Sequence, residues 1–412
     1  MSAEGAIAPT MAIQGKVKTF NPASKDWNWL WWFTLPLYPY SQRRTLCTEV
    51  VRDTIWTFDQ IQGILYVVTP IRMTAVKLDQ GGLLIYAPIA PTSECIRLVN
   101  ELVAEHGEVR YIILPTVSGL EHKVFVAPFA RRFPQAQVFV APHQWSFPFN
   151  LPLSWLGFPA SRTVVLPQDS RETPFGDQFE YAILGPVALG IGPFEEVAFF
   201  HPRSRSLLVT DAVVSIPDEP PAIVQLDPFP LLYHAKDRAS DRIEDTPENR
   251  RKGWHRISLF AFYFNPSALK IMDLLPSIKT ARTALDRSRK NYFGWFPYTW
   301  RADWHRSFEA LRGEGRLFVA PILQRLILNR IPNDAIAWAD RVASWNFERV
   351  IPCHFDSPIS ATPQQFRQAF AFLERQPLCD RALLPEADFG LLNDVDQELS
   401  KRGITPPAKE KI

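Results

Sequence analysis

Hydrophobic and polar positions along the chain follow the two spacings expected of an α/β protein. From Thr54 onward, short runs rich in Val, Ile, Leu and aromatic residues succeed one another at strand length, with Gly63 and Pro70 at expected turns. These runs are IWTFDQ, ILYVVTP, MTAVKL, GGLLIYAP (Gly81–Pro88), VRYIILP (Val109–Pro115) and AQVFVAP (Ala136–Pro142). Between the last three runs, apolar residues recur at helical spacing over Pro91–Gly107 and Lys123–Phe133. Strands that alternate with helices in this way predict right-handed parallel β-α-β units.

After Ser161 the pattern changes to successive strands with little helix between them, which predicts a second, largely antiparallel sheet. The strands expected there are RTVVLP, FEYAILG, VALGIG, EEVAFFHP and SLLVTDAVV (Ser206–Val214). Residues 217–312 are richer in charged and aromatic side chains and are expected to be mostly helical after Glu248. A strand in RVIPCHF and helices over Asn333–Trp345 and Thr362–Arg375 then return to the α/β pattern.

This pattern divides the chain into four parts. They are an N-terminal extension with an aromatic segment (1–53), a first α/β part (54–216), a mostly helical insertion (217–312), and a C-terminal α/β part with the tail (313–412).

Composition narrows the classes of function. The 45 basic and 43 acidic side chains leave a net charge of only +2 and form no long basic run, so no nucleic-acid partner is expected. No stretch reaches the roughly 18 apolar residues of a membrane-spanning helix. The four cysteines are far apart, which favours a reducing compartment, and we expect the cytoplasm.

An aromatic run near the N-terminus, WNWLWWFTLPLYPY (Trp27–Tyr40), is interrupted by Pro36 and Pro39. Trp and Tyr suit both a packed core and the boundary between water and a membrane. We expect most of its tryptophans to be buried against the domain, with peripheral contact to a membrane or a partner as the alternative.

Three motifs stand at predicted strand ends. T-V-S-G-L-E-H (Thr116–His122) follows the strand Val109–Pro115, SLLVTDAVV contains Asp211, and FERVIPCHFDSPI contains His354. In this order and these contexts they resemble the metallo-β-lactamase superfamily, which places T-H-x-H-x-D-H, a bridging aspartate and a last histidine at equivalent strand ends. The resemblance implies a four-layer αββα sandwich with a mostly helical insertion.

At a finer level the chain is similar to an uncharacterised family, a domain of unknown function seen mainly in oxygenic phototrophs. The segments that carry this resemblance are WTFDQIQGILYVVTPIRMTAVKL, GGLLIYAPIAPT, LFVAPILQRLIL and VIPCHFDSPI. The family resemblance implies no known activity.

The metallo-β-lactamase resemblance also implies which half of a two-metal site is lost. In that superfamily one metal takes the H-x-H pair and a further histidine. The corresponding positions here are Val117, Gly119 and, by a looser alignment, Gly192. None of these side chains can bind a metal.

The other metal takes the D-H pair, the last histidine and the bridging aspartate, and these positions are Glu121, His122, Asp211 and His354. All four can bind a metal, so the resemblance implies a half-retained site for one zinc, iron or manganese ion. Glu121 stands where the family has aspartate, and its extra methylene changes the reach to the metal. The alternative is a metal-free cluster in which these side chains bond to one another and to the backbone.

Other residues are weaker candidates. His143 follows the strand Ala136–Pro142 and is a loop residue that could face the same cleft, whereas Asp59, Arg72 and Asp79 lie near early strand turns and receive no role. In the insertion, Trp304, His305 and Arg306 repeat the tripeptide of 254–256. Arginine beside aromatic rings can bind an anion or stack on a flat ligand, and core packing with a surface arginine is the alternative.

Two functions from different classes remain open. One is a one-metal hydrolase of an ester-like or related carbonyl substrate, with the insertion as a lid over the ligand. The other is a metal-free binding or accessory protein for a pigment, lipid or protein partner, associated with photosynthetic membranes.

Overall fold

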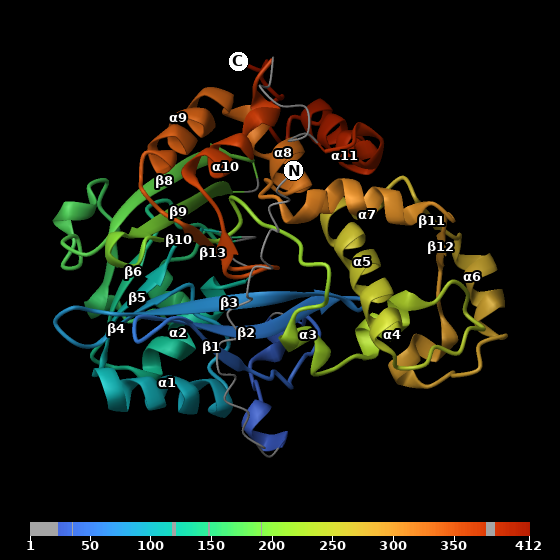
Figure 1. The fold of residues 1–412 in the computed structure, drawn as a ribbon, viewed down its shortest axis with the longest axis horizontal. Coiled ribbons are helices and arrows are strands. Elements are labelled where there is room, and N and C mark those ends of the chain that lie inside the picture. The colour runs from blue at the N-terminus through green and yellow to red at the C-terminus, as the bar shows by residue number, and fades with distance from the viewer. Residues whose placement is uncertain (1–23, 35, 118–120, 147–148, 191, 376–383) are drawn as a thin grey trace, which may run out of the picture.

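Two β-sheets face each other, helices cover the outer side of each, and a further group of helices lies at one end (Figure 1). This computed structural model describes residues 24–34, 36–117, 121–146, 149–190, 192–375 and 384–412. The layers confirm the predicted αββα sandwich with a mostly helical insertion.

The first sheet has seven strands in the order of the sequence. They are β1 (Leu46–Val51), β2 (Ile55–Ile64), β3 (Val67–Lys77), β4 (Leu83–Tyr86), β5 (Val109–Leu114), β6 (Gln137–Val140) and β7 (Thr163–Val165). Strands β1 to β4 pair antiparallel, and β4 to β7 pair parallel as the predicted β-α-β units require.

The expectation of three short strands with turns at Gly63 and Pro70 is wrong. Both residues lie inside β2 and β3, which form one long hairpin whose turn is at Leu65 and Tyr66. The turn residues have φ of 50° and 64°, conformations for which Asn and Gly are the usual signals. Leu and Tyr are not typical turn residues, so the sequence contains no sign of the turn. Packing of the Tyr66 ring on Tyr38 and Tyr233 stabilises the turn.

The second sheet has five strands in the order β14-β13-β10-β9-β8. They are β8 (Glu180–Ala188), β9 (Pro193–His201), β10 (Ser206–Val209), β13 (Arg349–Pro352) and β14 (Ile359–Ser360). Two expectations for this sheet are wrong. RTVVLP forms β7 at the edge of the first sheet, because its residues pair parallel with β6, and most of VALGIG continues β8 or its loop instead of forming a strand of its own.

Helices close both outer faces. Below the first sheet lie α1 (Ser93–His106) and α2 (Lys123–Arg132), and above the second lie α9 (Pro332–Ala343) and α10 (Pro363–Gln368) (Figure 1). The first turn of α1 is capped by Thr92, whose hydroxyl accepts the Cys95 N–H at 3.2 Å.

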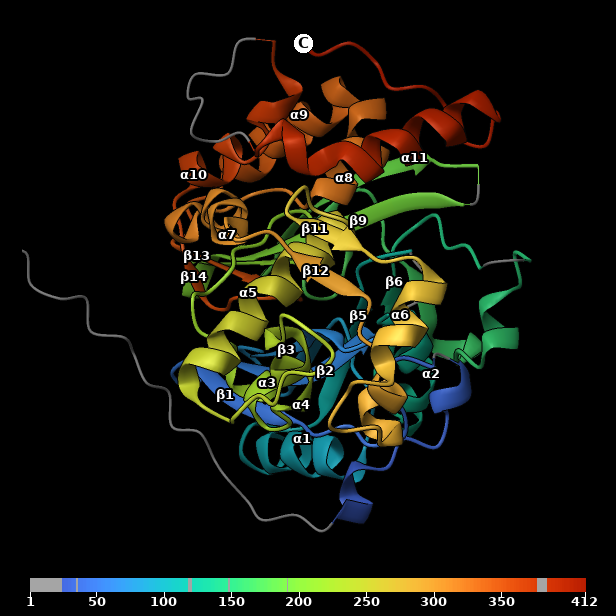
Figure 2. The ribbon, with the colours of Figure 1, turned by 90° about the vertical axis from the view of Figure 1, so that its right-hand side faces the viewer.

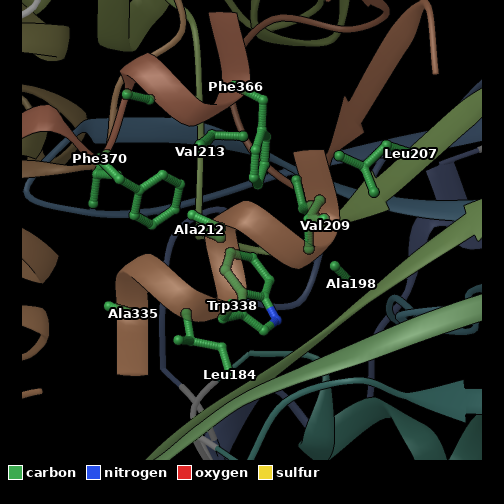
Figure 3. Close-up of a cluster of buried hydrophobic side chains, with 14 of the residues drawn as sticks. Leu184, Ala198, Leu207, Val209, Ala212, Val213, Ala335, Trp338, Phe366 and Phe370 are labelled. Atoms are coloured by element: carbon green, nitrogen blue, oxygen red, sulfur yellow. The ribbon is translucent and has the colours of Figure 1, made fainter. Parts of the chain in front are cut away.

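Separate apolar cores fill the spaces between the layers. Figure 3 shows the core beneath α9 and α10, where Trp338, Phe366 and Phe370 lie against the strand residues Leu207 and Val209. Other buried side chains fill the space between the two sheets and the space under α1 and α2. The sheets are thus fixed on both faces, which holds their strand ends in place.

The helices at the end of the sandwich come mainly from the predicted insertion (Figure 1). They are α3 (Ala222–Gln225), α4 (Phe229–Ala235), α5 (Pro247–Tyr263), α6 (Leu274–Ala281) and α7 (Trp304–Arg312), followed in the chain by α8 (Pro321–Leu326) and α11 (Gly390–Lys401). A two-stranded sheet of β11 (Leu269–Ile271) and β12 (Tyr298–Trp300) was not predicted. The division of the chain at 217 and 312 stays a prediction.

The N-terminal aromatic segment departs from its prediction. Trp29 is buried and packs edge-on against Phe125 of α2, and Trp27 is half-buried. Trp31 and Trp32 are exposed over 51% and 40% of their surface. The expected burial of most of these tryptophans is wrong, because the short turn that follows Trp29 leaves the sandwich. No helix in the described ranges is long and apolar enough to cross a bilayer.

Candidate metal centre

Three of the predicted site residues, Glu121, His122 and His354, meet where the two sheets end, and Asp211 lies beside His354. His122 is the residue before α2, Asp211 follows β10, and His354 follows β13. One ligand atom from each of Glu121, His122 and His354 lies within 4.8 Å of the others. Asp211 Oδ1 lies 3.3 Å from His354 Nε2. The predicted proximity of the two histidines is confirmed, since their ring centroids are 6.2 Å apart.

Both histidines are oriented by backbone carbonyls. His122 Nδ1 lies 3.0 Å from the Pro88 carbonyl oxygen, and His354 Nδ1 lies 2.9 Å from that of Pro70. Because a carbonyl can only accept, each Nδ1 carries the proton, and each Nε2 faces the cluster. Among the described residues, His122 Nε2 is buried without a hydrogen-bond partner.

The two carboxylates form the outer side of the cluster. About a third of each side chain is exposed, 32% for Glu121 and 31% for Asp211, whereas both histidines are buried. Gln62 of β2 donates to Glu121 Oε1 at 2.9 Å, and Glu121 Oε2 lies 2.8 Å from His354 Nε2. The imidazole rings therefore form the buried side of the cluster, and the two carboxylates form its solvent-facing side, which we call the carboxylate rim.

Glu196 of β9 fixes the backbone of Asp211. Its fully buried carboxylate accepts the N–H groups of Thr210 at 2.6 Å and Asp211 at 3.0 Å. Burial and the charge of Asp211 raise the pKa of Glu196 to about 7, although the two N–H bonds oppose this. The aspartate is thus held by a second acid that titrates near neutral pH.

The cluster shifts the pKa of each member. Burial lowers the pKa of His122 to about 4, so this ring is neutral at pH 7. Burial also lowers the pKa of His354, but the charges of Glu121 and Asp211 outweigh it and raise the pKa to about 10. Burial raises the pKa of Glu121, but His354 outweighs it and lowers the pKa to about 2. Burial and Glu121 raise the pKa of Asp211 to about 6 against the opposing charge of His354.

Arg72 holds the turn that carries His354, which corrects the expectation that Arg72 and Asp59 have no role. The guanidinium of Arg72 donates to the carbonyls of Pro352 at 2.7 Å and Phe355 at 3.0 Å, on either side of His354. Its Nε lies 2.8 Å from Asp59 Oδ1 as an ion pair. Phe355 has a φ of 56°, a left-handed conformation that costs a non-glycine residue free energy. Arg72 therefore stabilises a strained turn next to the site.

Two of the positions that the resemblance assigns to a first metal lie in packed surroundings. Val117 is buried in the core between the sheets. A Cβ built on Gly192 would lie 2.5 Å from the Trp145 ring, so the indole takes the space that a side chain at 192 would need. Gly119 lies outside the described residues.

His143 has a partner outside the cluster. Its Nδ1 lies 2.5 Å from Glu195 Oε2, and its backbone N–H donates to Glu195 Oε1 at 3.1 Å. Glu195 is fully buried, so its carboxylate orients a ring that is 48% exposed. His143 belongs to none of the groups of ligand atoms found among the described residues.

The tripeptide Trp304-His305-Arg306 begins α7. Trp304 packs edge-on against Trp300 and lies under the guanidinium of Arg256, whereas His305 and Arg306 are exposed. Among the described residues, no hydrogen bond, ion pair or ring contact joins the tripeptide to the cluster. Its proposed ligand-binding role stays a prediction.

Gln62, Glu195 and Glu196 were not among the predicted site residues, and Arg72 was assigned no role. Each is a polar residue inside a strand that is otherwise buried, and that contrast was the available signal. Polar groups in such positions need partners, and here the partners are the site residues and the turns that carry them.

The fold and the cluster define an α/β sandwich with a polar site at its strand ends. Residues 52–372 match the model of a domain of unknown function, DUF4336, and the chain belongs to this family. No curated protein matches the chain.

Several solved structures are similar to this chain. A metallo-β-lactamase from Pontibacter korlensis is 11% identical over 42% of this chain and 74% of its own, with a TM-score of 0.31. A flavo di-iron protein variant from Thermotoga maritima is 9% identical over 80% and 62%, with a TM-score of 0.39. The metal-soaked flavodiiron core of Flv1 from Synechocystis is 10% identical over 80% and 60%, with a TM-score of 0.37. At these sequence identities and TM-scores, the similarities do not indicate an activity for this chain.

Proposed function

We propose that this protein binds one divalent transition-metal ion at Glu121, His122, Asp211 and His354 and hydrolyses an ester-like or related carbonyl substrate. The observation that carries the proposal is the orientation of the two histidines. Both Nδ1 atoms are held by backbone carbonyls, which leaves both Nε2 atoms directed at one point. Metal-binding histidines are commonly oriented in this way by a partner on the other ring nitrogen.

The donor set fits a metal. Two imidazole nitrogens and two carboxylates suit zinc, iron or manganese. The lone pair of His122 Nε2 is buried without a partner among the described residues, and burial of such a group is costly. A cation bound there would supply the missing partner, and it would polarise a substrate carbonyl as a Lewis acid.

The carboxylates would serve as charged hydrogen-bond acceptors beside that position. Burial and the neighbouring Glu121 raise the pKa of Asp211 to about 6 in the metal-free protein, in spite of His354. A bound cation would lower this pKa, so Asp211 would be ionised at neutral pH and could accept a hydrogen bond from the attacking water. Asp211 is also partly exposed, which gives a substrate at the carboxylate rim access to it.

Metal content tests the proposal. Protein purified without chelator is analysed for zinc, iron and manganese in the wild type, His122→Ala, His354→Ala and the control His143→Ala. We expect about one equivalent of metal in the wild type and the control, because His143 is bound to Glu195 outside the cluster. Loss of most of the metal in the two cluster variants supports the site. Equal metal in all four proteins refutes it.

Activity is tested separately. The metal-loaded wild type is assayed with a panel of oxyester and thioester substrates, against Asp211→Asn as the variant that keeps an oxygen ligand but loses the titratable group. Hydrolysis that depends on the metal and falls in Asp211→Asn supports the hydrolase. A metal-loaded protein without activity on the panel rejects this substrate class and leaves the metal site standing.

One observation favours the metal-free alternative, an accessory protein for a pigment, lipid or protein partner at photosynthetic membranes. The protonated His354 ring pairs with both Glu121 and Asp211, so these charges are compensated without a metal. This alternative predicts a wild type without metal and an unchanged denaturation midpoint in chelator. The metal proposal predicts a lower midpoint in chelator, because a bound ion stabilises the folded state.

A further inference from the structure

Helix α6 buries a polar residue and exposes its apolar residues, the reverse of an ordinary surface helix. Ser277 is its buried residue, and the Ser277 hydroxyl accepts the indole N–H of Trp295 at 3.0 Å. Leu274, Leu275 and Ile278 are instead exposed over 65%, 80% and 46% of their surface. A helix on a water-facing surface normally buries its apolar side. The outward side of α6 therefore lacks the apolar contact that its sequence would favour.

The exposed apolar surface extends beyond the helix. Ile271, Leu285 and Phe293 are exposed over 46%, 72% and 66%, and together with the three apolar residues of α6 they make up what we name the α6 surface. Gly294, next to Phe293, lies against Ala281 at the end of α6. Figure 2 looks onto the end of the molecule that carries α6. Exposed apolar side chains that gather in one part of a water-facing protein often mark a binding surface.

The tryptophans of the N-terminal segment are linked to this surface. Tyr292, next to Phe293, interacts with the Tyr40 side chain, and the Tyr40 ring is 6.2 Å from that of Trp32. The turn that contains Trp32 also exposes Leu30 and Phe33, over 78% and 61% of their surface. Tyr292 and Tyr40 thus connect two segments that are far apart in the sequence and that each expose apolar side chains.

Positive charge predominates in the segment that carries the α6 surface. Residues 264–293 contain six exposed basic side chains and only two acidic ones, in a chain whose net charge is +2. The basic residues are Lys270, Lys279, Arg282, Arg287, Arg289 and Lys290. Within the described ranges, Lys290 is the one of these with an ion pair, 3.9 Å from Asp227. The other five are available to an external anion.

We propose that the α6 surface docks on an anionic lipid bilayer. Leucine and isoleucine side chains would enter the boundary between headgroups and acyl chains, with tryptophan and tyrosine at the interface and the basic residues on the lipid phosphates. A second copy of the chain fits less well, because a two-fold contact would place two sets of unpaired basic residues against each other. The proposal is independent of metal binding.

Vesicle cosedimentation of the full chain tests the proposal. The probes are vesicles of phosphatidylcholine with and without phosphatidylglycerol, at low and high salt. We expect binding only to the anionic vesicles, and weaker binding at high salt because exposed charges are screened. Leu275→Asp, and Lys279→Glu combined with Arg282→Glu, should each weaken binding by about tenfold or more, since insertion and headgroup attraction both contribute.

Matched controls carry the same changes elsewhere. Leu391→Asp on α11, and Lys401→Glu combined with Lys409→Glu, alter exposed residues near the C-terminus and should leave binding unchanged. Circular dichroism checks that every variant is folded. A wild type that does not bind anionic vesicles overturns the proposal, and so do α6 variants that bind like the wild type. Self-association that Leu275→Asp abolishes, without vesicle binding, assigns the surface to a second copy and overturns it as well.

Discussion

Replacement of Arg72 by methionine should destabilise the protein and disorganise the candidate site. The side chain is 4% exposed and connects the first sheet to the turn around His354 through two carbonyl hydrogen bonds and the Asp59 ion pair. Removal of one partner of a buried ion pair costs about 3–5 kcal/mol. The two carbonyls would each add to this, by about 1–3 kcal/mol where water cannot reach them. Burial already raises the pKa of Asp59 against the opposing effect of Arg72, so protonation of Asp59 limits the total. We expect a loss of about 3–5 kcal/mol.

Guanidinium unfolding of the metal-free protein, followed by tryptophan fluorescence, measures this loss. Arg203→Met is the matched control, because Arg203 pairs with Asp79 at an exposed position. Its expected cost is below about 1 kcal/mol. The double variant Arg72→Met with Asp59→Leu should recover part of the stability, since an apolar pair can replace a buried ion pair, but it should not recover metal retention. If Arg72→Met lowers the free energy of unfolding no more than the control does, the contacts of Arg72 do not stabilise the turn.

Two further predictions concern the site and the core. Between pH 7 and pH 9 the apparent metal affinity should rise about tenfold per pH unit, because the metal displaces one proton from His354, whose pKa Glu121 and Asp211 raise to about 10 against the effect of burial. A competition titration with a chromophoric chelator measures this slope, and an affinity that is independent of pH contradicts it. Trp338→Ala should cost about 3–5 kcal/mol in guanidinium unfolding, since its ring is buried and its indole donates to the Ala182 carbonyl at 3.1 Å. Trp155→Ala, at a 76% exposed position, should change stability by less than about 0.5 kcal/mol, and equal losses would contradict the assigned core.

The parts of the fold that the sequence predicted are those set by local spacing. The helices α1 and α2 and the parallel strand between them follow directly from apolar periodicity. The proximity of His122, Asp211 and His354 was expected from the superfamily resemblance and not from spacing. The structure places His122 and His354 in one group of ligand atoms, with Asp211 beside His354.

What the sequence did not predict depends on strand register and on contacts between sheets. Arg72 and Asp59 are directly opposite each other across β2 and β3, but this pairing follows from a hairpin turn whose residues gave no turn signal. The function of Glu196 depends on the approach of β9 to the end of β10. Neither contact corresponds to a fixed interval in the chain, so a periodic pattern cannot reveal it.

The positions that the resemblance assigns to two metals differ in their surroundings. At Gly192 the Trp145 ring fills the space that a side chain would need. At the positions of the other metal, Glu121, His354 and Asp211 neutralise one another, and this pairing would persist with or without a metal. His122 distinguishes the two cases. Its Nε2 is buried, neutral and without a partner among the described residues, and the carbonyl of Pro88 holds the ring in that orientation. A polar cluster kept only for structure gains nothing from such a nitrogen, whereas a metal ligand requires it.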